Sequence, residues 1–160
     1  MIDRRILQVL KLIESRLRGS GIRWVLAGSV SLALQGVDVN PNDIDILTDR
    51  NGAFQINRIL KEYEIRPVRL RRSKRFQSYF GEFEINGVRV EVMGDLKERV
   101  GLEWRDLSHR LSAPKITKVE EVKLPISPLE DQLRSYRALR RRKDLSKIQK
   151  IAKALEKSGD

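Results

Sequence analysis

Two short stretches of the chain alternate between acidic and aliphatic residues, and this pattern most limits how the chain can fold. Asp43 and Asp45 alternate with isoleucines, and Glu91 lies between two valines. Successive side chains of a strand point to opposite faces, so each stretch predicts a strand with one apolar face and one acidic face. If the two strands are neighbours, Glu91 lies beside both aspartates. The alternative is a solvated polar face, with Glu91 paired to Arg89.

The rest of the chain interleaves further strands and helices. Asn86-Gly87 between two apolar runs is typical of a tight hairpin turn. Ser127 is expected to cap a helix, with Pro128 in its first turn. Periodicity predicts helices over 3–18, 29–35, 53–63, 127–140 and 143–157, and strands over 22–27, 43–48, 65–70, 76–85 and 88–93, with one or two more in 115–124. The order indicates an α+β fold around a mixed sheet.

The chain length of 160 residues suits one compact domain. We expect residues 1–125 to form the catalytic core and 126–160 to add two C-terminal helices to the same domain. No apolar run approaches the roughly 20 residues of a membrane helix. The N-terminal segment lacks the features of a secretory signal. A cytoplasmic protein without a membrane partner is therefore expected.

Residue usage limits the chemistry. The chain has no cysteine and one histidine, His109, which excludes disulfides, thiolate zinc sites and a cysteine nucleophile. A metal would be bound by oxygen ligands and would be a hard ion, Mg²⁺ or Mn²⁺. The carboxylates of Asp43, Asp45 and Glu91 are the candidate ligands, because crowded carboxylates repel one another unless a cation lies between them.

The formal net charge of +11 favours a polyanionic partner, either a nucleic acid or a nucleoside triphosphate. Arginines concentrate in two runs, 66–75 and 134–143. In the first run, Arg69, Arg71 and Arg72 are candidates for binding RNA or another acceptor, since arginines beside aromatic residues contact phosphates and stack bases. The alternatives are a solvated charged surface and a composition typical of thermophiles.

A Gly28-Ser29 turn follows the apolar strand 22–27 and opens a short helix. Glycine permits close approach of the backbone to a ligand, and a helix N-terminus presents free N–H groups to a phosphate. These two residues are therefore candidates for binding the triphosphate. A Gly-Ser turn that only begins a helix is the commoner case.

Together, Leu26-Ala27-Gly28-Ser29, Asp43-Ile44-Asp45-Ile46 and Val90-Glu91-Val92 resemble the active-site signature of the DNA polymerase β superfamily of nucleotidyltransferases. Thirteen residues separate Ser29 from Asp43. The resemblance spans roughly residues 22–95. It implies a palm-like sheet, and it implies that the three carboxylates hold two metal ions against a nucleoside triphosphate.

The segment 80–95 is similar to small prokaryotic nucleotidyltransferases of the abortive-infection type, which often carry an acidic helix start and a late Lys-Asp pair. Here these correspond to Glu130-Asp131 and Lys143-Asp144. That subgroup commonly has a lysine in the middle of the helix, where this chain has Tyr136. Arg137 and Lys143 are the candidate cations for the triphosphate.

The function predicted is transfer of a nucleoside monophosphate from the triphosphate to an acceptor hydroxyl on RNA, a protein or a small molecule. The competing reading is a non-catalytic module that binds RNA or a cognate toxin or antitoxin protein. Three mutually repelling carboxylates favour the enzyme, because a module without turnover has no electrostatic reason to keep them.

Overall fold

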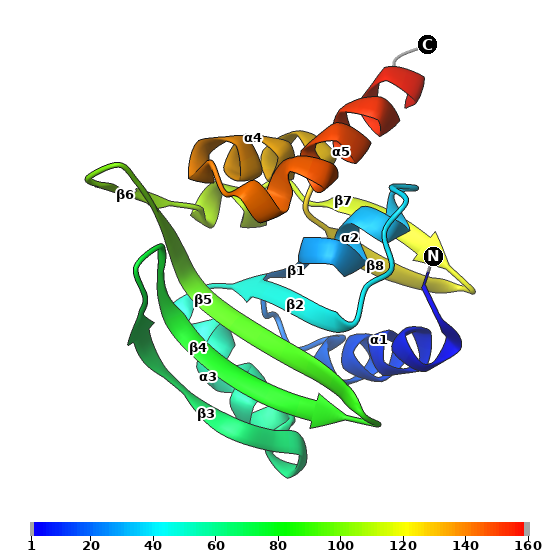
Figure 1. Ribbon diagram of the computed structural model, residues 1–160. Coiled ribbons are helices and arrows are strands. Elements are labelled where there is room, and N and C mark those ends of the chain that lie inside the picture. The colour runs from blue at the N-terminus through cyan, green and yellow to red at the C-terminus, as the bar shows by residue number, and fades with distance from the viewer. Residues whose placement is uncertain (1, 159–160) are drawn as a thin grey trace.

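The computed structural model describes residues 2–158 and has one mixed sheet with helices on both sides (Figure 1). The α-helices are α1 (Arg4–Leu17), α2 (Gly28–Leu34), α3 (Arg50–Ile59), α4 (Leu129–Leu139) and α5 (Leu145–Ser158). The strands are β1 (Trp24–Ala27), β2 (Asp43–Thr48), β3 (Glu64–Arg72), β4 (Phe76–Ile85), β5 (Val88–Val100), β6 (Glu103–Asp106), β7 (Lys115–Val119) and β8 (Val122–Ile126). Short 3₁₀ turns occupy 61–63, 108–111 and 142–144.

The sheet order is β3-β4-β5-β2-β1-β8-β7, with β6 paired to the far end of β5. Most neighbours are antiparallel, but β2 runs parallel to β5 and β1 runs parallel to β8. The parallel pairing of β2 with β5 places two segments that are distant in sequence side by side at the centre of the sheet. This pairing fixes where the acidic residues lie.

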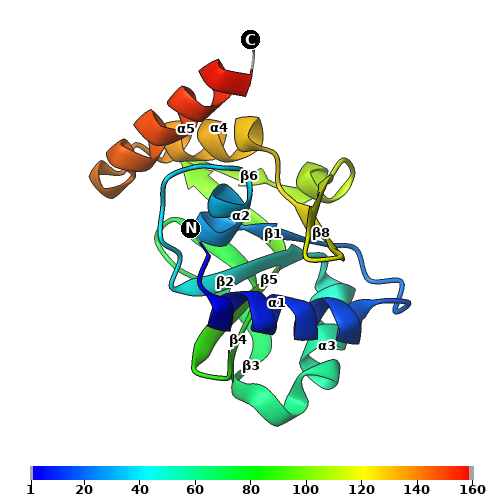
Figure 2. The same ribbon diagram turned by 90° about the vertical axis from the view of Figure 1, so that its right-hand side faces the viewer.

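One face of the sheet is covered by α1 and α3, as Figure 2 shows. Helix α1 begins at Asp3, whose carboxylate accepts a hydrogen bond from the Ile6 N–H at 2.9 Å. Its apolar stripe, which includes Leu10 and Ile13, packs on the aliphatic sheet face, which includes Ile44 and Val90. The main core therefore lies between α1, α3 and the sheet, on the side opposite the acidic side chains.

Helices α4 and α5 pack together on the other side of the sheet (Figure 1). A second apolar cluster joins them to α2 and the loop after it, through Leu32, Val37, Leu133 and Ile151. The α+β fold with a mixed sheet is thus confirmed. The division of the domain at residue 125 stays a prediction.

Local details differ from the sequence expectations. Strand β5 continues to Val100 and forms a hairpin with β6, a strand that the sequence pattern does not indicate. The expected capping of α4 by Ser127 is wrong, because Pro128 occupies the N-cap position and the buried Ser127 hydroxyl has no hydrogen-bond partner. Across residues 2–158, no helix is both long and apolar enough to cross a membrane.

Candidate active site

The acidic residues of the two alternating strands meet on one face of the sheet. Asp45 lies directly opposite Glu91 in the parallel register of β2 and β5, and Asp43 precedes Asp45 by two residues on the same face. The intervening Ile44, like Val90 on β5, is fully buried on the opposite face. The alternation seen in the sequence therefore orients all three carboxylates, and the pairing of β2 with β5 gathers them.

Gly28 lies against this carboxylate group. Its φ of +65° belongs to the left-handed region that favours glycine. A Cβ atom at this position would be 2.2 Å from Asp45 Oδ2. Strand β1, which leads into Gly28, pairs with β2 so that Ala27 is opposite Asp45. The glycine therefore lets the β1–α2 turn approach the Asp45 carboxylate as closely as it does.

Burial and repulsion between neighbouring carboxylates raise the pKa of Asp45 and of Glu91. Burial, followed by the charges of Glu91 and Asp43, raises the pKa of Asp45 to about 7. Burial, then Asp43 and Glu82, also raises the pKa of Glu91. A divalent cation would reverse both shifts, since it stabilises the ionised form. Carboxylates with such perturbed pKa values in a cleft are typical of functional sites.

The carboxylates open into a cleft of about 1060 Å³. Gly28, Ser29, Asp43, Asp45 and Glu91 line its floor. Its walls contain the predicted arginines of β3, Arg69, Arg71 and Arg72, and the predicted Lys143. The sequence-predicted triphosphate, metal and acceptor residues thus share one cleft, with the exception of Arg137.

The strand registers arrange the cleft wall in rows. Glu91 on β5 faces Glu82 on β4, and one row further along Met93 faces Phe80, which in turn faces Arg69 on β3. The sheet face is therefore acidic at Glu91 and Glu82, apolar at Met93 and Phe80, and basic at Arg69 on the edge strand β3. A ligand that spans these rows meets cations at the edge of the sheet and carboxylates at its centre.

The C-terminal helices add residues to the cleft that sequence reasoning did not assign. Tyr136 lines it, and the Lys147 ammonium lies 5.5 Å from the centre of the Tyr136 ring. The positive charge of Lys147 acts on Asp45, whose pKa it lowers against the larger raising effects. Lys147 follows Lys143 by four residues, and this helical spacing was the only available signal for it.

Arg141 is the second unassigned cation of the cleft. Its Nε donates to the fully buried Asp144 carboxylate at 2.7 Å, and its guanidinium lies 5.6 Å from the centre of the Phe76 ring. Arg137, by contrast, lines a separate hollow together with Arg75 and Arg140. The structure therefore brings Lys143, but not Arg137, to the carboxylates.

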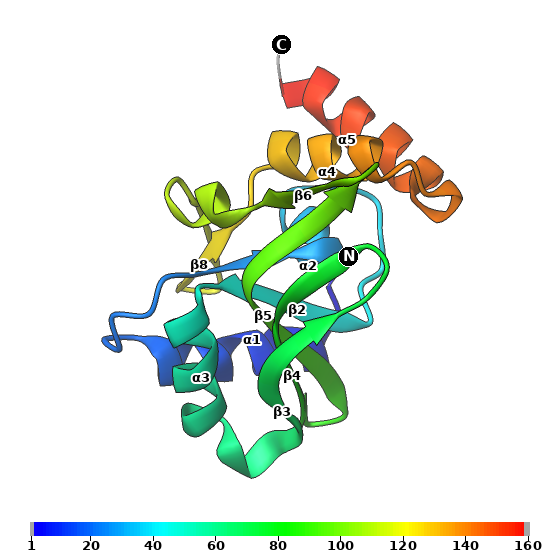
Figure 3. The same ribbon diagram turned by 90° about the vertical axis from the view of Figure 1, so that its left-hand side faces the viewer.

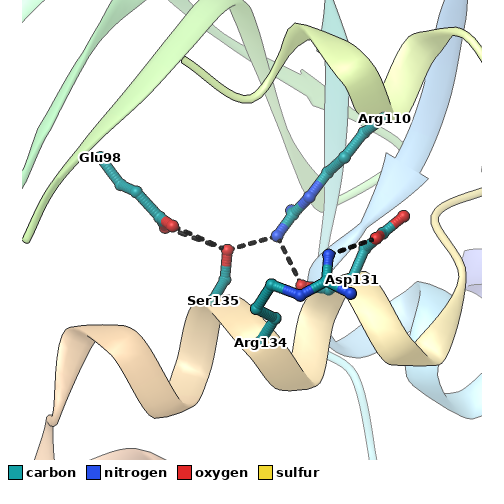
Figure 4. Close-up of polar contacts among 5 residues, drawn as sticks. All are labelled: Glu98, Arg110, Asp131, Arg134 and Ser135. Atoms are coloured by element: carbon teal, nitrogen blue, oxygen red, sulfur yellow. Dashed lines mark hydrogen bonds and ion pairs between the residues drawn. The ribbon is translucent and has the colours of Figure 1, made fainter. Parts of the chain in front are cut away.

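A buried polar network fastens α4 to the sheet beside the cleft (Figure 4). The Ser135 hydroxyl contacts both oxygens of Glu98, at 3.1 and 3.0 Å, and an Nη2 hydrogen of Arg110 is donated to Ser135 Oγ. The same Arg110 nitrogen donates to the Asp131 carbonyl at 3.0 Å. All three linked side chains are buried, and burial lowers the pKa of Arg110. The network joins β5, the 108–111 turn and α4.

The donor set suits a hard cation. Within residues 2–158, no group of three or more Asp, Glu or His side chains is arranged so that it could hold a metal ion by itself. Mg²⁺ is usually bound by one or two carboxylates together with substrate phosphates and water, so the protein need not enclose it. The ionisable oxygens of Asp43 and Asp45, beside a turn that only glycine permits, fit that requirement.

Comparison with known proteins agrees with this geometry. Residues 9–151 match the family described as aminoglycoside-2″-adenylyltransferase, and the chain belongs to this family. No curated protein sequence matches the chain. A structure from Thermotoga maritima assigned to the nucleotidyltransferases is 35% identical, with a TM-score of 0.82 over 98% of this chain and 96% of that one.

Two antibiotic-modifying enzymes share the fold at low identity. The lincosamide adenylyltransferase LnuA, solved with lincomycin, is 14% identical with a TM-score of 0.58 and covers 94% of this chain and 96% of its own. ANT(2″)-Ia, solved with adenylyl-2″-tobramycin, is 8% identical with a TM-score of 0.61 and covers 94% and 89%. The chain is therefore a nucleotidyltransferase by family and fold. The narrower abortive-infection resemblance stays a prediction.

Proposed function

We propose that this protein transfers a nucleoside monophosphate from a nucleoside triphosphate to an acceptor hydroxyl, with Mg²⁺ or Mn²⁺ bound by Asp43, Asp45 and Glu91. The observation that carries the proposal is the convergence of these three carboxylates at the floor of one cleft beside Gly28. A non-catalytic module would gain nothing from the resulting repulsion, which the raised pKa of Asp45 reflects.

Each residue has a role in an in-line displacement at the α-phosphorus. Gly28 and Ser29, with Lys143 and Lys147 on the facing wall, bind the triphosphate and neutralise its charge. Asp43, Asp45 and Glu91 would hold two divalent ions, which would supply activation of the attacking hydroxyl and charge stabilisation of the leaving pyrophosphate. Glu91 accepts the hydroxyl proton as the acceptor oxygen bonds to phosphorus and the bond to pyrophosphate breaks.

The charge of the cleft favours an anionic acceptor. Arg69, Arg71 and Arg72 line the cleft beyond the apolar row of Phe80 and Met93, so this wall is cationic. An aminoglycoside carries protonated amines, so it would be repelled from this wall. Among RNA, protein and small molecules, we favour an acceptor that carries phosphate groups, with RNA as the first candidate.

The test of the reaction uses each α-labelled nucleoside triphosphate with Mg²⁺ and total cellular RNA. The expected result is covalent label on RNA with the parent protein and a loss of at least about 100-fold in rate with Asp45→Asn. Asp38→Asn is the matched control, because Asp38 is exposed in the loop before β2 and lies outside the cleft. Equal labelling by the parent and Asp45→Asn would refute the proposed site.

A second experiment distinguishes the residues that bind the acceptor from those that bind the triphosphate. Replacement of Arg69, Arg71 and Arg72 by Ala is expected to reduce RNA labelling but to preserve the rise in melting temperature caused by Mg²⁺ and triphosphate. Asp45→Asn is expected to abolish most of that rise. If the triple variant labels RNA as well as the parent does, the β3 arginines do not bind the acceptor.

A further inference from the structure

A second hollow, of about 650 Å³, lies outside the cleft, between the β5–β6 hairpin and the last turn of α4. Figure 3 shows β6 and α4 on the same side of the molecule. Five arginines line the hollow: Arg75, Arg99, Arg105, Arg137 and Arg140. Among the described residues, no acidic side chain lines it. Its remaining surface is apolar or glycine, so nothing within the hollow offsets the positive charge.

Within residues 2–158, these five arginines form no salt bridge with a carboxylate. Nine salt bridges join side chains within residues 2–158, and all of them use other lysines and arginines. Arg75 donates to the Leu139 carbonyl at 3.1 Å, and Arg99 donates to the Gly101 carbonyl at 3.1 Å. Like charges gathered without counter-charges repel one another, and an anion from outside the chain removes that repulsion.

One carboxylate of the hairpin is already engaged. Glu98 is opposite Arg105 in the β5–β6 register, yet its side chain is buried and both of its oxygens contact the Ser135 hydroxyl. The hairpin is thereby fixed to α4, while the arginines around it stay available. The hollow is a concave, cationic surface formed by the β5–β6 hairpin and α4, which the Glu98–Ser135 contact joins.

Two contacts connect the hollow with the arginine wall of the cleft. The Arg72 guanidinium lies 4.9 Å from the centre of the Trp104 ring on β6. The contact between Arg75 and Leu139 brings the β3–β4 turn against the end of α4. The basic surface therefore continues from the cleft past a partly exposed tryptophan to the hollow.

We propose that this hollow binds single-stranded nucleic acid through its phosphodiester backbone. The arginine fork matches phosphate oxygens in two-point contacts, and cations spread over several positions match a repeating phosphate chain better than one small anion. Trp104 supplies a ring on which an unpaired base can stack. A nucleoside triphosphate already has cationic partners in the cleft, next to the carboxylates.

The test measures binding of a fluorescent oligouridylate of about twelve nucleotides to the full chain by anisotropy, without Mg²⁺ or triphosphate. Turnover is absent, so failure here leaves the proposed transferase reaction untouched, and failure of that reaction leaves this binding untouched. Arg105→Gln combined with Arg137→Gln removes two exposed charges of the hollow. Arg5→Gln combined with Arg58→Gln removes two exposed charges from α1 and α3, on the far side of the sheet.

Two lost phosphate contacts are expected to flatten the slope of log K against log salt by about 1.4 and to weaken binding roughly twentyfold at 0.1 M salt. The control variant is expected to bind like the parent. Equal losses in both variants would overturn the proposal in favour of general attraction by net charge. Displacement of the oligouridylate by equimolar tripolyphosphate would overturn the proposal, because the hollow would then bind a small anion. Equally tight binding of polyglutamate would also overturn it, because the hollow would then bind an acidic protein.

Discussion

Gly28→Ala tests how closely the β1–α2 turn must approach the carboxylates. The new side chain meets two costs: the left-handed φ of +65°, about 1–2 kcal/mol for an L-residue, and a Cβ position 2.2 Å from Asp45 Oδ2. Relief of that overlap requires Asp45 to leave its rotamer, which costs about 0.5–1.5 kcal/mol more. The free energy of unfolding is therefore expected to fall by about 2–3 kcal/mol.

Gly36→Ala is the matched control. Gly36 has a φ of +85° and nothing within 4 Å of the position that a Cβ would occupy, so it carries the backbone cost without the overlap. Gain of a methyl group restricts the unfolded chain equally in both variants, and that effect cancels in the difference. In urea unfolding, the free energy of unfolding of Gly28→Ala is expected to be about 1 kcal/mol lower than that of Gly36→Ala.

The same pair examined in an Asp45→Ala background isolates the contact. Without Oδ2, Gly28→Ala is expected to cost no more than Gly36→Ala, so the coupling energy between positions 28 and 45 equals the overlap cost. Gly28→Ala in the parent should also abolish the rise in melting temperature with Mg²⁺ and triphosphate, since Asp45 is displaced. Equal costs for the two glycine variants in both backgrounds would refute the reasoning.

Three further outcomes follow from the site. The pKa of Asp45, raised from 3.8 to about 7, means that its ionisation destabilises the metal-free fold as the pH rises from about 4 to 7. Asp45→Asn should therefore gain stability over the parent across that window, by at most about 1.4 kcal/mol per pH unit; a pH-independent difference in urea unfolding contradicts this. Ser135→Ala leaves two buried charged groups without their shared partner and should lower the free energy of unfolding by about 2–3 kcal/mol, against no loss for the exposed Ser146→Ala. Lys147→Gln should raise the KM for the triphosphate roughly tenfold, whereas Lys153→Gln on the exposed face of α5 should leave it unchanged; equal KM values would remove Lys147 from the site.

Local alternation was sufficient to predict the acidic face. The isoleucines beside Asp43 and Asp45, and the valines beside Glu91, determine which side of each strand is buried. A stretch of about five residues in each strand is enough to show this alternation. The mixed sheet and the helix order followed from the same periodicities. The assignment of Arg69 and Arg71 to one face also follows from alternation on β3.

Contributions from α4 and α5 were less accessible to sequence reasoning. Arg137 and Arg141 are four residues apart, yet they line different cavities, because α4 ends at Leu139 and Arg140 adopts a left-handed conformation that redirects the chain. Which arginine reaches the carboxylates depends on that reversal and on the packing of α4 against β5. The roles of Lys147 and of the β5–β6 hairpin likewise depend on tertiary contacts.

The parallel pairing of β2 with β5 has a consequence for the order of folding events. Strands β3, β4 and β5 form consecutive antiparallel hairpins from local contacts, whereas Asp45 and Glu91 are 46 positions apart and meet only when a long loop closes. Repulsion between their carboxylates opposes that closure at neutral pH. Formation of the proposed active site is therefore expected to be slowed by its own carboxylate charges, and the metal-free chain is expected to complete its sheet faster where Asp45 is protonated.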